Sequence, residues 1–144
     1  ALVVGCSGAG KAAAAAVLTM GFGTTVLMNR TQAKAEALRE HLMSFYEGEI
    51  ADDELAVRPI EEFAQAFAEA DVVVYTLPVA IAEELDVSKG KMILEANYKT
   101  PCLEKYADRC TYISGLNWLY NQAVTSYEVF TGEEPDEEAM KKVL

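Results

Sequence analysis

Short apolar runs alternate with longer segments of helical periodicity along the whole 144-residue chain. The apolar runs predict about six strands, at residues 2–5, 24–28, 56–58, 72–75, 91–94 and 111–114. Between them, apolar residues recur every three or four positions and predict helices at 9–20, 32–44, 59–68 and 116–130, with a short one after Pro135. This alternation predicts an α/β fold, a doubly wound, mainly parallel sheet of Rossmann type with helices on both faces.

A glycine-rich turn follows the first strand. It reads Gly5-Cys-Ser-Gly-Ala-Gly-Lys and continues into alanines that favour a helix. Glycines permit a sharp turn and a close approach, and the free N–H groups of a helix start attract an anion. The turn therefore predicts a pyrophosphate site made of Gly5, Ser7, Gly8, Ala9 and Gly10. Small residues at such a turn also serve helix packing, and that alternative stays open.

The end of the second strand indicates which dinucleotide binds. An NAD-binding protein usually carries an acidic residue about 20 positions beyond the glycines, to hold the ribose hydroxyls. Here that position is Asn29, and Arg30, Thr31 and Lys34 follow it. Two cations suit a phosphate on the ribose, so we expect NADP rather than NAD. The alternative, an exposed Arg and Lys at a helix start, is disfavoured because cations oppose the helix dipole there.

Composition narrows the class of protein. The 23 acidic and 12 basic residues give a net charge of −11, which disfavours binding to nucleic acid or to an anionic membrane. The sequence has no leader-like segment and no apolar run of roughly 18 residues, so we expect a cytoplasmic protein. Cys6, Cys102 and Cys110 lack metal-site spacing, and we expect buried reduced thiols and no metal.

The length suits a single domain over residues 1–144. The chain begins inside its expected central strand and without an initiator methionine. We therefore expect a domain of a longer protein, with further sequence ahead of it.

Several motifs together carry a family resemblance. They are the glycine turn, the Asn29-Arg30-Thr31 run with Lys34-Ala35, the Gly115-x-x-Trp118-Leu119-x-x-Gln122-Ala123 segment and Phe130-Thr131-Gly132. In this order and spacing they resemble the C-terminal NADP-binding domain of shikimate dehydrogenases, especially those fused to dehydroquinate dehydratase. The resemblance implies reversible NADP-dependent reduction of 3-dehydroshikimate to shikimate, a step in aromatic amino-acid biosynthesis.

The resemblance also implies residue roles. The glycine turn would hold the pyrophosphate, and Arg30 and Lys34 would hold the 2′-phosphate with Asn29 and Thr31. The remaining cofactor positions would be Thr76, Leu77, Ala96 and Gly115, and Tyr98 and Gln122 would face the substrate. Both substrate assignments have alternatives, because Tyr98 can cap a loop and Gln122 can bond its own helix.

The sequence departs from the family pattern at three places. Tyr75-Thr76-Leu77 replaces an Asn-x-Thr, Glu95 replaces an aspartate before Tyr98, and Trp118 replaces a methionine. The family's catalytic lysine and aspartate belong to an N-terminal substrate domain that is absent here, so no catalytic residue is assigned. Lys99 and Lys105 are interpreted as surface residues, and His41, expected to lie remote from the strand ends, receives no role.

Three functions remain open. The first is the cofactor half of a shikimate dehydrogenase acting on shikimate and 3-dehydroshikimate. The second is a module of a diverged quinate- or shikimate-like dehydrogenase, or a dinucleotide sensor without catalysis. A glutamyl-tRNA reductase domain, which shares the Asn29-Arg30-Thr31 motif, is a distant third.

Overall fold

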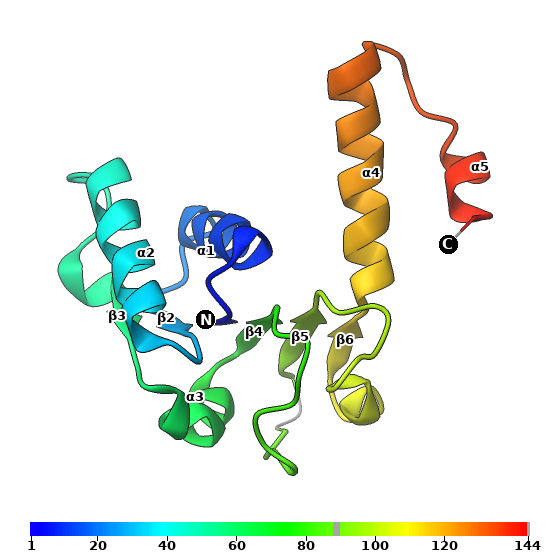
Figure 1. The fold of residues 1–144 in the computed structure, drawn as a ribbon. Coiled ribbons are helices and arrows are strands. Elements are labelled where there is room, and N and C mark those ends of the chain that lie inside the picture. Colours follow the sequence, from blue (N-terminus) through cyan, green and yellow to red (C-terminus); the bar gives the residue numbers. More distant parts are fainter. Residues whose placement is uncertain (88–89, 144) are drawn as a thin grey trace.

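A computed structural model describes residues 1–87 and 90–143, and its backbone forms one six-stranded sheet (Figure 1). The strands are β1 Leu2–Val4, β2 Thr25–Met28, β3 Leu55–Val57, β4 Val72–Tyr75, β5 Met92–Glu95 and β6 Thr111–Ile113. Their order is β3-β2-β1-β4-β5-β6, and every neighbouring pair is parallel. This order, with the first strand at the centre, confirms the predicted Rossmann-type sheet.

The described part of the chain also forms five α-helices and three short 3₁₀ turns, and the last two helices follow the last strand. The helices are α1 Gly8–Thr19, α2 Gln32–Phe45, α3 Phe63–Glu69, α4 Gly115–Thr131 and α5 Glu137–Lys141, and the 3₁₀ turns are Asp52–Glu54, Ile60–Glu62 and Glu104–Tyr106. The predicted boundaries agree within about two residues, except that Pro59 precedes a 3₁₀ turn and the α-helix begins only at Phe63.

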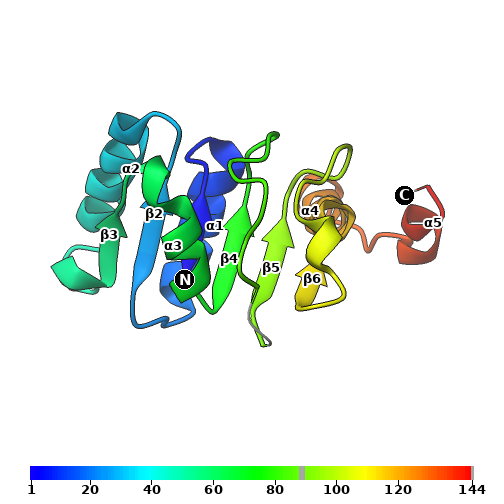
Figure 2. The ribbon, with the colours of Figure 1, turned by 90° about the horizontal axis from the view of Figure 1, so that it is seen from below.

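Two hydrophobic clusters cover the two faces of the sheet. Alternation along β1 sends Leu2 and Val4 to one face, where they meet α3, and Val3 to the other, where it meets α1 and α2. Figures 1 and 2 show α1, α2 and α4 on one side of the sheet and α3 on the opposite side. The sheet is therefore buried from both sides, as expected for parallel strands.

The three cysteines are free thiols, but only Cys6 is fully buried. Cys102 and Cys110 are half-buried, because they lie in the loop after β5 and directly before β6 rather than within a strand. The expectation of three buried thiols was wrong for these two.

Candidate functional site

A cleft of about 590 Å³ opens at the carboxyl ends of β1, β2 and β4. Proteins with parallel sheets bind ligands at this edge, next to the central strand, where the order in which strands are added to the sheet changes from one side to the other. The residues that line the cleft come from the turn between β1 and α1 and the start of α1, from the start and one face of α2, and from the loop after β4. They are Cys6, Ser7, Gly8, Lys11, Asn29, Arg30, Thr31, Lys34, Ala37, Leu38, His41, Thr76, Leu77 and Pro78. The position and volume of the cleft suit a ligand of nucleotide size.

Close backbone packing builds the glycine turn. Gly5 adopts a positive φ of 98°, which glycine tolerates best, and its amide donates to the carbonyl of Met28 at 2.8 Å. A Cβ at Gly10 would lie only 1.8 Å from the Gly5 carbonyl oxygen, so α1 can start against the strand only if residue 10 is glycine. A Cβ at Gly8 meets no atom within 4 Å, because this residue faces the open cleft. Gly10 thus serves helix packing, whereas Gly8 keeps room for a ligand.

Asn29 ties the glycine turn to the start of α2. Its side-chain oxygen accepts from the Cys6 amide at 3.2 Å, and its side-chain nitrogen donates to the Thr31 carbonyl at 3.0 Å. Thr31 occupies the N-cap position of α2, but its side chain makes no capping hydrogen bond. Thr31 thus precedes the first turn of α2 without capping it through its side chain. Thr31 instead lines the cleft.

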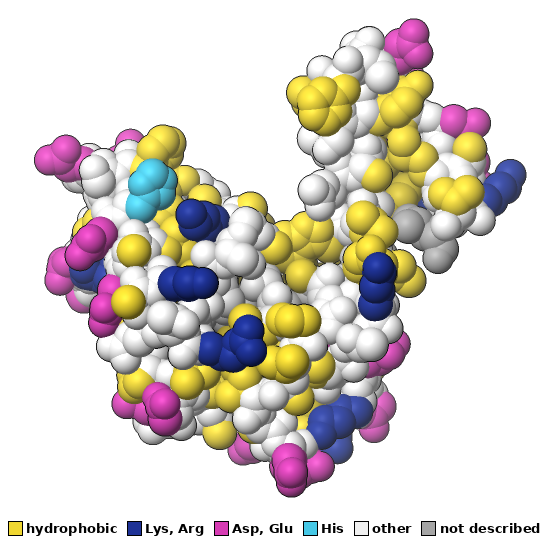
Figure 3. Space-filling model, in the orientation of Figure 1, with side chains coloured by type: hydrophobic (Ala, Val, Ile, Leu, Met, Phe, Trp, Pro, Cys, Tyr) yellow, Lys and Arg dark blue, Asp and Glu magenta, His cyan; other side chains and the backbone are white. Residues whose placement is uncertain are grey.

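The cations of the cleft have no partners among the described residues. Lys11, Arg30 and Lys34 form no ion pair and donate no side-chain hydrogen bond within residues 1–87 and 90–143. The lining contains no aspartate or glutamate, although the chain has 23 acidic residues. Figure 3 shows the corresponding face, where Lys and Arg side chains and the single histidine gather. An unbalanced positive cleft in an acidic protein favours an anionic ligand.

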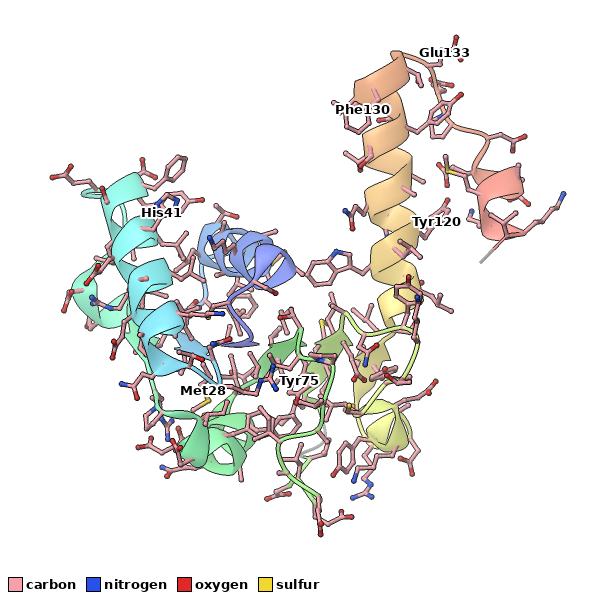
Figure 4. The ribbon with its side chains drawn as sticks, in the orientation of Figure 1. Met28, His41, Tyr75, Tyr120, Phe130 and Glu133 are labelled. Atoms are coloured by element: carbon pink, nitrogen blue, oxygen red, sulfur yellow. The ribbon has the colours of Figure 1, made fainter. Side chains whose placement is uncertain are left out.

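His41 lines the same cleft, contrary to our expectation that it lies remote from the site. Figure 4 shows it on α2, away from the end where the helix leaves β2. The reason is helical periodicity: positions 34, 37, 38 and 41 share one face of α2, so a residue far from the strand end in sequence still faces the cleft. Lys11, from the first turns of α1, is a second lining residue to which sequence reasoning gave no role.

Thr76 supports the glycine turn with its side chain. Its hydroxyl donates to the Val4 carbonyl at 2.9 Å, and a Cβ at Gly5 would come within 2.3 Å of the hydroxyl oxygen. Leu77 and Pro78 follow it in the cleft wall. Tyr75 holds the loop after β4 in place, because its hydroxyl donates a hydrogen bond to the Val79 carbonyl. Burial raises the Tyr75 pKa, which keeps the phenol protonated as a donor.

A buried carboxylate holds the loop after β5. Glu95 is fully buried, and it accepts hydrogen bonds from the amides of Cys102 and Leu103 at 2.5 and 2.9 Å and from the Tyr112 hydroxyl at 2.8 Å. Three donors satisfy the carboxylate, as a buried charge requires. Glu95 is therefore an anchor for the loop that carries Tyr98, a role that the sequence alone did not indicate.

The remaining predicted site residues lie outside the cleft lining. Gly5, Ala9 and Gly10 belong to the glycine turn but do not line the cleft, and Gly115 packs against the end of β5, where a Cβ would meet the Ala96 carbonyl oxygen at 2.5 Å. Tyr98 is 42% exposed beside Lys99, and Gln122 is exposed on α4. Lys99 and Lys105 are also exposed, and Lys105 pairs with Glu84 at 3.7 Å. The structure thus brings the expected phosphate-binding groups together and leaves the two expected substrate groups apart from them.

Metal binding and membrane insertion have no support in the described residues. No cluster of three or more His, Cys, Asp or Glu residues there has a geometry suited to a metal ion. Within residues 1–87 and 90–143, no helix is both long and apolar enough to cross a membrane.

Comparisons with known proteins agree with the motifs. No family model matches the chain. The chain is 30% identical over 154 aligned residues to the shikimate dehydrogenase (NADP(+)) of Archaeoglobus fulgidus, an alignment that covers 99% of the chain and 54% of that protein. The chain therefore spans about half the length of the curated relatives it matches.

Solved structures share the fold over nearly the whole chain. Quinate dehydrogenase from Corynebacterium glutamicum in complex with NAD superposes with a TM-score of 0.80 at 23% identity, covering 98% of this chain and 52% of that one. Shikimate 5-dehydrogenase from Thermus thermophilus in complex with shikimate gives 0.71 at 26% identity, covering 98% and 51%. In sequence and in fold, the chain is thus similar to about half of a shikimate dehydrogenase.

Proposed function

We propose that this chain is the cofactor-binding half of an NADP-dependent shikimate dehydrogenase, which interconverts 3-dehydroshikimate and shikimate. The observation that carries the proposal is the acid-free cleft with Arg30 and Lys34 at the end of β2. Relatives that carry NADP(+) in their names support the cofactor assignment.

The residues of the cleft fit NADP. The turn around Ser7 and Gly8 leaves open space for a pyrophosphate beside the start of α1. Arg30 and Lys34 supply the positive charge for a phosphate on the ribose, and Asn29 fixes their turn to the glycine turn. When bound, NADP supplies a nicotinamide ring that accepts or donates a hydride. The chain's own contribution is to bind and orient that cofactor.

Calorimetric titration with NADP and with NAD tests the assignment. NADP should bind more tightly, and Arg30→Ala should remove most of the difference, about 10-fold to 150-fold, because it deletes a charge-assisted contact. Arg109→Ala is the matched control, since Arg109 is exposed and lies outside the cleft lining, where it contacts Asp108 at 3.9 Å and the Tyr106 ring at 5.3 Å from its centroid. Equal affinity of the native chain for the two cofactors would refute the proposal.

The proposal includes a second domain elsewhere in a longer protein. Its support is the half-length match to the relatives and the apolar side chains that α4 leaves in solvent, Val129 at 76% and Phe130 at 86%. That domain would hold the catalytic groups, and α4 is the part of this chain against which it would pack. We therefore expect the 144-residue chain to bind NADP without oxidising shikimate. Shikimate-dependent NADPH formation by this chain alone would contradict that expectation.

Substrate identity has a second candidate. Tyr75, Thr76 and Glu95 depart from the family pattern, and the fold is shared with a quinate dehydrogenase. A quinate-like substrate, or a sensing role, would leave the cofactor site as described. Rates of the complete protein with shikimate and with quinate distinguish these alternatives, and a faster reaction with quinate would favour the second candidate. A cytoplasmic location is part of the same proposal and is tested by fractionation of cells that express the protein.

A further inference from the structure

Lys11 is a positively charged residue of the cleft to which none of the sequence motifs gave a role in ligand binding. It lies in the first turns of α1, three residues after Gly8, so the two residues share one face of the helix. Both line the cleft, and the Lys11 side chain is exposed there. Its backbone amide already donates to the Ser7 carbonyl at 2.8 Å, so only the ammonium group is available to a ligand.

The surroundings of Lys11 indicate where the ammonium group acts. Side chains on a helix lean toward its N-terminus, so Lys11 leans back over the glycine turn. The positive charge of Lys11 lowers the Cys6 pKa, against a larger rise from burial that brings it to about 11. The Cys6 amide is bonded to Asn29, so Cys6 lies on the side of the turn that faces the start of α2. The Lys11 ammonium group is therefore directed to the place where the glycine turn meets the start of α2.

A basic residue at this place is electrostatically unfavourable without a ligand. Lys11 opposes the positive end of the α1 dipole and has no acidic partner within residues 1–87 and 90–143. Arg30 and Lys34 lie across the cleft at the start of α2 and lack such partners as well. An anion between the two helices relieves the repulsion among all three.

We propose that Lys11 binds the ribose 2′-phosphate of NADP from the α1 side of the cleft, while Arg30 and Lys34 bind it from the α2 side. This inference rests on the proposed function, since it assigns a further residue to the same cofactor. Lys11 is then a determinant of NADP specificity. The pyrophosphate interacts instead with the backbone around Ser7 and Gly8.

Titration of Lys11→Met with NADP and with NAD tests the inference. We expect about a tenfold loss of NADP affinity and less than about a twofold change for NAD, because a single charge-assisted contact to the 2′-phosphate is lost. Lys11→Arg keeps the charge and should retain most of the affinity. Lys142→Met removes the same charge from an exposed site outside the cleft and should change neither affinity.

The outcomes separate this inference from the proposed function. If the native chain binds neither cofactor, or binds both equally, the proposed function fails. If the native chain prefers NADP but Lys11→Met weakens NADP and NAD alike, Lys11 acts on the pyrophosphate and the inference fails. Unchanged NADP affinity in Lys11→Met also overturns it. Thermal unfolding of each variant verifies that the exposed substitution leaves the fold intact.

Discussion

Helices α2 and α4 lie on the same side of the sheet but attach to it very differently. Over 14 residues, α2 buries Ala35, Leu38 and Leu42 against the cluster that also contains Val3 and Leu27. Over 17 residues, α4 buries only Gly115 completely, and Trp118 packs partly against the same cluster. Figure 1 shows α4 extending away from the sheet, and Figure 4 shows Phe130 at its distal end.

The position of each helix in the topology explains this difference. A helix that connects two neighbouring parallel strands must return across the sheet, so α2, between β2 and β3, is held flat on it. Helix α4 follows β6, the edge strand, and no later strand in the described residues brings the chain back. The cleft is thus built by the constrained part of the molecule, and the exposed apolar side chains of α4 belong to the unconstrained part.

The largest expected effect on stability is at Phe67 in the packed core, which is to be compared with Phe130 on the exposed part of α4. Phe67 on α3 is fully buried, stacks edge-on with Phe63 at a centroid distance of 5.7 Å and lies under the Lys91 ammonium. Phe67→Ala should lower the free energy of unfolding by about 3–5 kcal/mol, because it leaves a cavity in a packed core. Urea unfolding measures the loss. A loss below about 1 kcal/mol would mean that this part of the core is not packed as described.

The next largest effect tests how tightly the cleft is built. Gly10→Ala would place a Cβ 1.8 Å from the Gly5 carbonyl oxygen, which forces α1 away from the glycine turn. We expect a loss of about 1–3 kcal/mol in stability and weaker binding of NADP and NAD alike. Gly8→Ala is the matched control for stability, since its Cβ meets no atom within 4 Å. If both variants unfold at the same urea concentration, Gly10 is not required for packing.

The glycine turn also shows how much of the structure could be predicted from the sequence. The strands and the glycine turn depend on residues that are close in sequence, and they were predicted to within about two positions. The places of Lys11 and His41 depend on how α1 and α2 rotate on the sheet, which the core residues decide together. The hydrogen bonds of Thr76 and Glu95 join groups that are up to 72 residues apart in the sequence, so no local sequence pattern could predict them.

A smaller, pH-dependent effect is expected on the β6 side. Burial raises the Tyr112 pKa, and the hydrogen bond to Glu95 raises it further, so the folded chain holds this proton more tightly than the unfolded chain. Stability should therefore fall as the pH rises above about 10, where unfolded tyrosine ionises. The slope is at most about 1.4 kcal/mol per pH unit, and less for a half-buried phenol that solvent screens.

Tyr112→Phe removes this proton and should make the alkaline decline shallower without abolishing it, because burial also raises the Tyr75 pKa; the variant also loses a hydrogen bond at neutral pH. Urea unfolding between about pH 8.5 and about pH 11 measures the slope for each protein. Tyr127→Phe, on the exposed part of α4, is the control and should keep the native slope. An identical slope in Tyr112→Phe would show that the phenol titrates equally in both states.

The smallest effect concerns Phe130, which is 86% exposed on α4. Phe130→Ala removes the same atoms as Phe67→Ala but should change the free energy of unfolding by less than about 0.5 kcal/mol, because little apolar surface returns to water. The two variants measured side by side in urea give the cost of the truncation with and without packing. A loss above about 1 kcal/mol for Phe130→Ala would show that α4 packs within this chain or against a second copy. In a longer protein whose second domain covers α4, the same substitution should instead cost about 3 kcal/mol or more, approaching the Phe67 value.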